Sequence, residues 1–218
     1  GLGGTAHGAP GPPARTLRRD QQLDELAALD DEVDDLHAAL ITYLGRLSTE
    51  KLGKLESSRV SEYIAATNYF ENIGDMVETN LVDAGRSRIE RELQISPSTQ
   101  QILTGLNEKV QWAVEAATEA LTTQDKQLAQ RVLDAKTEIS ALAVQAEGHL
   151  TARLSADEPH RLAVFRVETD VVEAFKRIYY FAKRVAKLVL EEADSKPEKR
   201  LTPEAQTPLE QHDAEQVV

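Results

Sequence analysis

Proline is almost absent from the middle of this 218-residue chain, and this most constrains how the chain can fold. The chain holds eight prolines, but only Pro97 and Pro159 fall within residues 14–196. Because proline breaks the interior of a helix, long stretches without it leave room for long helices. Proline is tolerated in the first turn of a helix, so Pro97 and Pro159 are predicted to mark two helix starts.

Apolar residues recur every three or four positions throughout this proline-poor segment, a spacing typical of amphipathic helices. Five helices are predicted, over about 20–47, about 49–86, from Ser96-Pro97 onward, about 125–154, and from near Pro159 to about 193. No segment alternates with the period of two that a strand shows, so we expect no sheet. Short connections favour antiparallel neighbours, and the predicted fold is an all-α, antiparallel bundle of long helices.

The two ends of the chain differ in composition from this helical middle. Residues 1–19 are rich in Gly and Pro and are predicted to form a flexible linker. Residues 194–218 are polar, contain three prolines and are predicted to be a disordered tail. One helical domain, over residues 20–193, is predicted between them. Whether a membrane domain precedes Gly1 is left open by the sequence.

Charge and composition exclude several classes of function. The 25 Lys and Arg are outnumbered by 37 Asp and Glu, a net charge of −12 that argues against a nucleic-acid partner. The chain has no cysteine, which rules out disulfides, thiolate metal sites and cysteine nucleophiles. It also lacks the Gly-x-Ser-x-Gly motif of serine hydrolases and the phosphate-binding glycine loop of nucleotide hydrolases. We therefore expect no catalytic activity.

The chain contains an internal repeat with an offset of 105 residues, the spacing from Leu23 to Leu128 and from Ile73 to Ile178. It relates the first two predicted helices to the last two. Two similar helical units are therefore predicted, and the helix that begins at Ser96 opens the second unit. Residues 1–19 are too rich in Gly and Pro to form its counterpart, so the first helix of the first unit is predicted to be missing.

Acidic residues line one face of the second predicted helix. Glu71, Asp75 and Glu78 are four and three positions apart, so their side chains lie on the same face. Adjacent carboxylates in such a row repel by about 0.2–0.5 kcal/mol per pair, and a hard cation would relieve the repulsion. Gly74 lies inside this helix, where Gly costs about 1 kcal/mol relative to Ala. This cost indicates that another part of the chain or a ligand comes close to the helix at Gly74. The spacing alone favours an exposed acidic face, and a metal site is the alternative.

Basic residues cluster toward the end of the last predicted helix. They are Lys176, Arg177, Lys183, Arg184 and Lys187. Cations near a helix C-terminus are stabilised by the helix dipole by about 0.3–1 kcal/mol each, and a solvated face needs no further explanation. The functional alternative is contact with anionic lipid or with a partner, such as the acidic face of the second helix.

Residues 70–75 (Phe-Glu-Asn-Ile-Gly-Asp) resemble the acidic motif of PhoU-like proteins. In that motif, three residues separate a Glu from an Asp, and the two residues before the Asp are usually Ile-Gly. Residues 29–37 and 175–186 make the chain most similar to the C-terminal domain of bacterial sodium/phosphate cotransporters. The similarity covers about residues 20–193. It implies two three-helix repeats, here without the first helix, a role in phosphate homeostasis, and a divalent or ferric metal ion at the acidic motif.

The second repeat departs from the family pattern. A symmetric member would carry Glu and Asp where this chain has Lys176 and Tyr180, so the second acidic motif is lost. A nearby ammonium group opposes cation binding. The metal role implied by the resemblance therefore transfers to Glu71 and Asp75, with Glu78 as an additional ligand.

The resemblance implies a regulatory or scaffolding domain of a sodium-dependent phosphate transporter, on the cytoplasmic face of the bacterial plasma membrane. Its partner would be the transmembrane part of that transporter. The alternatives are a free-standing PhoU-like, metal-binding regulator of phosphate signalling and a generic helical adaptor. Because a helix is missing, we expect an exposed apolar groove and self-association, with a homodimer as the simplest form.

Overall fold

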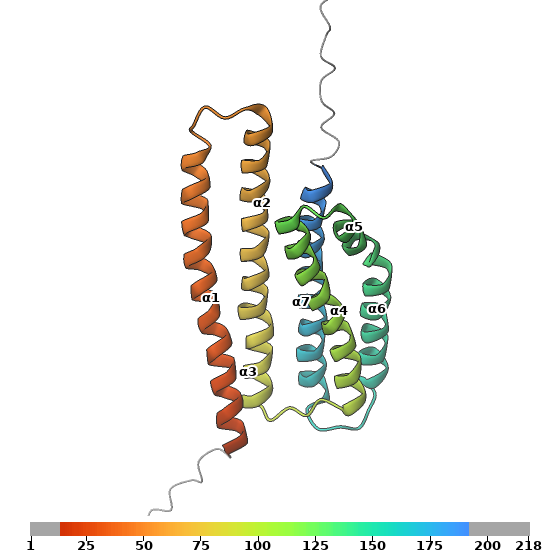
Figure 1. Ribbon diagram of the computed structural model, residues 1–218. Helices are drawn as coiled ribbons and strands as arrows, with labels where there is room; N and C mark the ends of the chain where they lie inside the picture. The colour runs from red at the N-terminus through yellow and green to blue at the C-terminus, as the bar shows by residue number, and fades with distance from the viewer. Residues whose placement is uncertain (1–13, 192–218) are drawn as a thin grey trace, which may run out of the picture.

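The computed structural model describes residues 14–191 (Figure 1). Residues 1–13 of the predicted linker and the whole predicted tail lie outside this range. Within it the chain is helical and has no strand, which confirms the predicted all-α fold. The elements of residues 14–191 are α1 (Ala14–Leu47), α2 (Lys54–Met76), the π-helix η1 (Val77–Val82), α3 (Asp83–Glu90), α4 (Pro97–Thr123), α5 (Lys126–Asp134), α6 (Lys136–Arg153) and α7 (Arg161–Glu191).

These elements make five long helical segments, as predicted. α2, η1 and α3 follow one another without a break and form the second segment. α5 and α6 are separated only by Ala135 and form the fourth. The third begins as predicted, because the hydroxyl of Ser96 accepts a hydrogen bond from the backbone N–H of Thr99 at 3.1 Å and Pro97 occupies the first turn.

The bounds of two predicted helices need correction. α1 begins at Ala14, inside the segment predicted as a linker, because no proline follows Pro13 to stop the helix. The second segment spans 54–90 rather than 49–86. Its start is set by Gly53, whose backbone N–H donates to the carboxylate of Glu56 at 2.8 Å, and the chain turns out of the helix at Glu92, which has a left-handed φ of 53°.

α7 is the central helix of the bundle and contacts α2, α3, α4, α5 and α6. Small side chains let the neighbouring helices pack closely around it, as ridges and grooves of helices require. The fully buried alanines of α4 and α7 are Ala113, Ala117, Ala120, Ala182 and Ala186. We call α1–α3 the first unit and α4–α7 the second unit. Most of the hydrophobic core lies in the second unit and where α2 packs on it.

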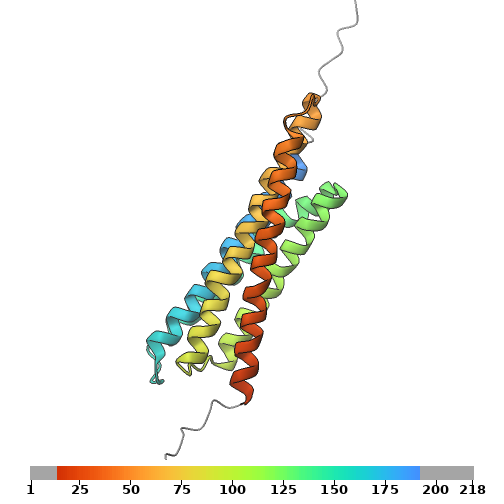
Figure 2. The ribbon, with the colours of Figure 1, turned by 90° about the vertical axis from the view of Figure 1, so that its left-hand side faces the viewer.

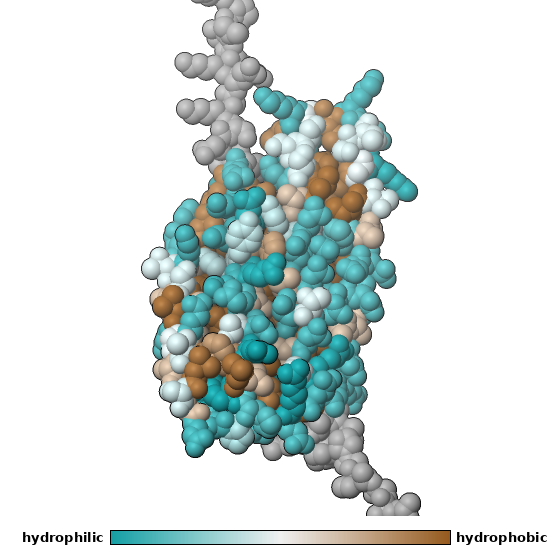
Figure 3. Space-filling view, turned by 180° about the vertical axis from the view of Figure 1, so that it is seen from behind, coloured by the Kyte–Doolittle hydropathy of each residue, from teal (hydrophilic) through white to brown (hydrophobic). Residues whose placement is uncertain are grey.

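α1 lies at one edge of the elongated bundle and, among residues 14–191, contacts only α2, η1 and α3 (Figures 1 and 2). The first unit thus has two helical segments where the second has three. Large apolar side chains of α1 stay in contact with solvent, with Leu29 52% and Leu36 60% exposed. A groove lined by Leu26, Leu29 and Ile89 runs between α1 and α3. The face seen from behind also carries separate hydrophobic patches (Figure 3).

We predict that the chain self-associates through this face of α1. Leu36→Glu should weaken the association about tenfold or more, because burial of one Leu side chain contributes about 1.5–3 kcal/mol. Sedimentation velocity over a range of protein concentrations measures the effect. Leu162→Glu is the matched control, since Leu162 of α7 is 59% exposed and lies in the other unit. A wild-type chain that stays monomeric at high concentration would contradict the prediction.

Candidate metal centre

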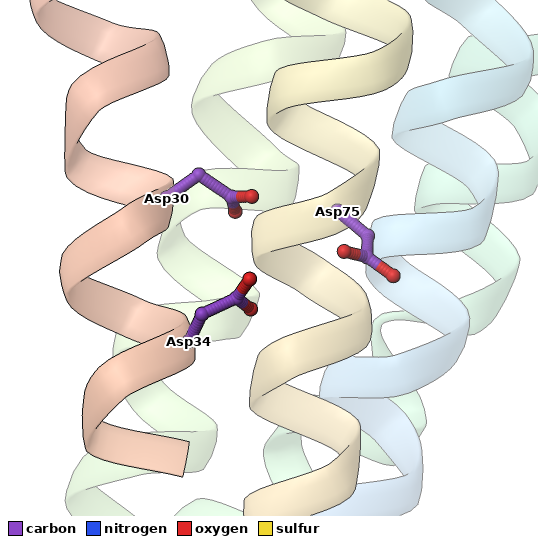
Figure 4. Close-up of side chains that lie close together, drawn as sticks. All are labelled: Asp30, Asp34 and Asp75. Atoms are coloured by element: carbon purple, nitrogen blue, oxygen red, sulfur yellow. The ribbon is translucent and has the colours of Figure 1, made fainter. Parts of the chain in front are cut away.

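Three aspartates from two helices come together where α1 packs against α2. Asp30 and Asp34 are one turn apart on α1, and Asp75 lies near the end of α2. One carboxylate oxygen from each of the three lies within 4.8 Å of the other two. Figure 4 shows Asp30 and Asp34 projecting from α1 toward α2, the helix that carries Asp75. The arrangement offers only oxygen ligands, which hard cations prefer.

Gly74 allows the two helices to meet at this point. A Cβ atom at residue 74 would lie 2.8 Å from Oδ1 of Asp30 and 3.3 Å from Cγ1 of Val33. The close approach that a mid-helix glycine indicated therefore comes from the side chains of α1. Two turns earlier on α2, Oδ1 of Asn68 lies 2.9 Å from Nε2 of His37, a hydrogen bond that fixes the register of α1 against α2.

The cluster concentrates negative charge around Asp30. Burial raises the pKa of the Asp30 carboxyl, and the nearby carboxylates of Glu78, Asp34, Asp75 and Asp31 raise it further. The folded chain therefore holds this proton more tightly than the unfolded chain does. As the pH rises from the ordinary pKa of Asp30 to the raised one, its contribution to the free energy of unfolding falls. At neutral pH the ionised carboxylate of Asp30 therefore opposes folding, and a bound cation would remove this cost.

A π-helix directly follows the cluster, and the apolar spacing of the sequence did not predict it. η1 starts at Val77, two residues after Asp75, and includes Glu78. The hydroxyl of Thr79, which lies in η1, donates to the backbone carbonyl of Asp75 at 2.6 Å. This hydrogen bond connects the cluster to the π-helix. Short π-helical segments within α-helices occur frequently at functional sites.

Of the three acidic residues predicted to bind metal, the structure places only Asp75 in the cluster. Asp75 belongs to the cluster, and Glu78 is close enough to raise the pKa of Asp30. Glu71 does not join them; one of its carboxylate oxygens accepts a hydrogen bond from the side chain of Asn72 at 3.3 Å. The sequence pattern did not single out Asp30 and Asp34 as candidate ligands. Their signal was the run of acidic residues over 29–37, in which these two are spaced by one helical turn.

The predicted basic stripe does not form a single surface. Arg184 donates to the hydroxyl of Tyr69 on α2 at 2.8 and 3.0 Å, so it joins α7 to a tyrosine and not to the acidic face. Lys176 lies on the other side of α7, with its Nζ 2.9 Å from Glu147 of α6 and 2.7 Å from Glu173. Lys183 is half-buried on that same side, whereas Arg177 and Lys187 are exposed.

No helix between residues 14 and 191 is both long enough and apolar enough to cross a bilayer.

Comparison with known proteins identifies the fold. No protein-family model matches the sequence, and no curated protein matches it. A search of solved structures finds the crystal structure of PhoU from Pseudomonas aeruginosa, with a TM-score of 0.74. The match covers 80% of this chain and 82% of the other at 17% identity. At that identity the likeness concerns the fold alone, and it shows that this chain has a PhoU-like, all-helical fold.

Proposed function

We propose that this chain is a non-catalytic regulatory or scaffolding domain that acts in phosphate homeostasis and binds a metal ion. The cluster of Asp30, Asp34 and Asp75 carries the proposal. It lies at the close contact of α1 and α2 in a PhoU-like fold, and it includes the Asp of the motif that resembles this family. The ion would be divalent or ferric, since the ligands are carboxylate oxygens without a thiolate or imidazole.

Metal binding offers a way to regulate through α1. Among residues 14–191 this helix contacts only α2, η1 and α3, and the carboxylates around Asp30 disfavour its ionised form. An ion bound by Asp30, Asp34 and Asp75 would join α1 to α2 and favour the docked position. A ligand shifts such an equilibrium by its difference in affinity for the two states. The position of α1 is the signal that a partner would detect.

Two settings fit this function. In the first, the chain is the cytoplasmic domain of a sodium/phosphate cotransporter, and the transmembrane part packs on the exposed apolar face of α1. In the second, it is a free-standing regulator of phosphate signalling, and a second copy covers that face. The DNA upstream of the codon for Gly1 separates the two. Several long apolar spans in frame would favour the transporter, and a start codon directly before Gly1 would favour the free-standing regulator.

The metal site is tested by calorimetric titration of the full chain, first treated with a chelator, with Mn²⁺. We expect Asp34→Asn and Asp75→Asn each to weaken binding about tenfold or more, because each removes a charged ligand. Asp35→Asn is the matched control, since it removes the same charge from the next residue of α1, outside the cluster. A wild-type chain that binds no Mn²⁺ would count against the metal site and favour a generic adaptor, as would an equal loss in the control.

Asp30→Asn is expected to change stability and metal affinity in opposite directions. Without metal, the variant should unfold at a higher temperature, because it removes a carboxylate whose ionised form is disfavoured by burial and neighbouring charges. With Mn²⁺ it should bind more weakly than wild type. Thermal unfolding with and without the ion measures both effects. A variant that is less stable in both conditions would show that Asp30 has a structural role.

A further inference from the structure

The second unit contains a pocket of about 280 Å³ between α6 and α7. Lysines from both helices reach it: Lys136 from the start of α6, and Lys176 and Lys183 from α7. Between these charged ends the wall is apolar and includes Val144 and the ring of Tyr180. Both of these side chains are also well exposed, at 66% and 50%. The pocket is therefore open, basic and partly apolar.

The sequence repeat relates this pocket, between α6 and α7, to the contact between α1 and α2 in the first unit. The offset of 105 residues matches Asp31 with Lys136, Glu71 with Lys176, Asp75 with Tyr180, and Glu78 with Lys183. Three carboxylates are thus replaced by three ammonium groups, and a fourth by a phenol. Of these four acidic residues only Asp75 belongs to the cluster, so the repeat places positive charge mainly where the first unit has carboxylates around the cluster.

Tyr179 forms part of the wall of this pocket. It stands at the position that matches Gly74, where α1 comes close to α2. Its buried ring lines the pocket, and its hydroxyl donates to the backbone carbonyl of Val132 at 2.9 Å. Burial, with Asp134 nearby, raises the pKa of Tyr179 to about 12, so the hydroxyl remains a donor at neutral pH. The wall of the pocket therefore carries a buried ring at the position where the first unit has no side chain.

The positive charge at one end of the pocket lacks a counterion. Lys176 is paired with Glu147 and Glu173, but among residues 14–191 neither Lys136 nor Lys183 has a carboxylate partner. Nζ of Lys183 lies over the rings of Tyr179 and Tyr180, 5.7 and 6.0 Å from their centroids. Burial lowers the pKa of Lys183, and the charges of Lys136 and Lys187 lower it further. A bound anion would supply the missing negative charge.

We infer that this pocket binds an organic phosphate monoester, with its phosphate between Lys136 and Lys183 and its apolar body against Val144 and Tyr180. A phosphate monoester carries about −1.5 to −2 charges at pH 7, which matches two ammonium groups. Its apolar part suits a pocket larger than a single phosphate ion. The inference goes beyond the proposed function and does not depend on it, because it concerns the second unit and needs no metal. Such a group is found in soluble esters and in the headgroup of phosphatidic acid.

The test uses the full chain with two probes. Phenyl phosphate is titrated by calorimetry, and vesicles of phosphatidylcholine with and without phosphatidic acid are used in a flotation assay. We expect saturable binding of at least one probe, weakened about tenfold by Lys183→Gln and by Lys136→Gln, since each removes a charge-assisted hydrogen bond. Arg177→Gln is the matched control, because Arg177 is an exposed cation of α7 outside the pocket.

The possible results distinguish a soluble phosphate ester from a lipid headgroup, and both from a pocket that binds neither. Binding of phenyl phosphate identifies a soluble ester, and association only with vesicles that contain phosphatidic acid identifies a lipid headgroup. If neither probe binds, the inference is overturned. It is also overturned if Arg177→Gln weakens binding as much as Lys183→Gln does, because the attraction would then come from the overall positive charge of α7 and not from this pocket. Circular dichroism of each variant confirms that the fold is retained.

Discussion

Replacing Arg161 with methionine is expected to lower the free energy of unfolding by about 3–5 kcal/mol. Arg161, at the start of α7, donates to a carboxylate oxygen of Glu168 two turns later at 2.7 Å. The side chain of Glu168 is fully buried and that of Arg161 is 7% exposed. Without Arg161, the carboxylate would remain in the core without its counterion. Urea denaturation followed by circular dichroism measures the change.

A double substitution distinguishes this loss of pairing from a loss of packing. Arg161→Met with Glu168→Met removes both charges and should recover most of the lost stability, because a buried ion pair is often no more stable than apolar side chains of similar size. Among residues 14–191, Nε of Arg161 and Oε1 of Glu168 also lack hydrogen-bond partners, which limits how much the ion pair stabilises the fold. If the double variant is as unstable as Arg161→Met, then packing at residue 161 is the cause.

Most of the fold follows from the sequence because the helical segments are long and regularly patterned. Proline spacing predicted the helix starts near residues 97 and 159, and the apolar spacing predicted all five segments. The interruptions inside them could not be predicted. η1 follows Met76 and a break occurs at Ala135, yet neither site has a proline or a paired glycine to mark it. Such changes in hydrogen bonding depend on how neighbouring helices pack.

Only half of the candidate site could be predicted, because its candidate ligands come from two helices that meet by tertiary packing. The spacing of Glu71, Asp75 and Glu78 identified one acidic face. Asp30, Asp34 and His37 on α1 have the same spacing of four and three. Two helices with matching acidic faces repel, so local patterning alone argues against their contact. The two helices nevertheless meet at Gly74. This contact brings Asp75, and not Glu71, close to Asp30 and Asp34.

Gly74→Leu is expected to separate α1 from α2 and to abolish the candidate metal site in the same variant. Its Cβ alone would lie 2.8 Å from Asp30, and the rest of the side chain would occupy the space of Val33. Overpacking of this kind costs about 1–3 kcal/mol. Gly105→Leu is the control, because no other atom lies within 4 Å of its Cβ position in α4, and helix propensity should stabilise it by nearly 1 kcal/mol.

The two glycine variants should therefore change stability with opposite signs in urea denaturation. Hydrogen exchange should show that Gly74→Leu exposes the amides of α1 while those of α4 and α7 stay protected, since α1 contacts neither helix among the described residues. Mn²⁺ affinity should fall only in Gly74→Leu. If Gly74→Leu instead stabilises the chain as its control does, α1 does not pack tightly at residue 74. The three aspartates would then lack the helix contact that brings them together, and regulation through α1 would lose its structural basis.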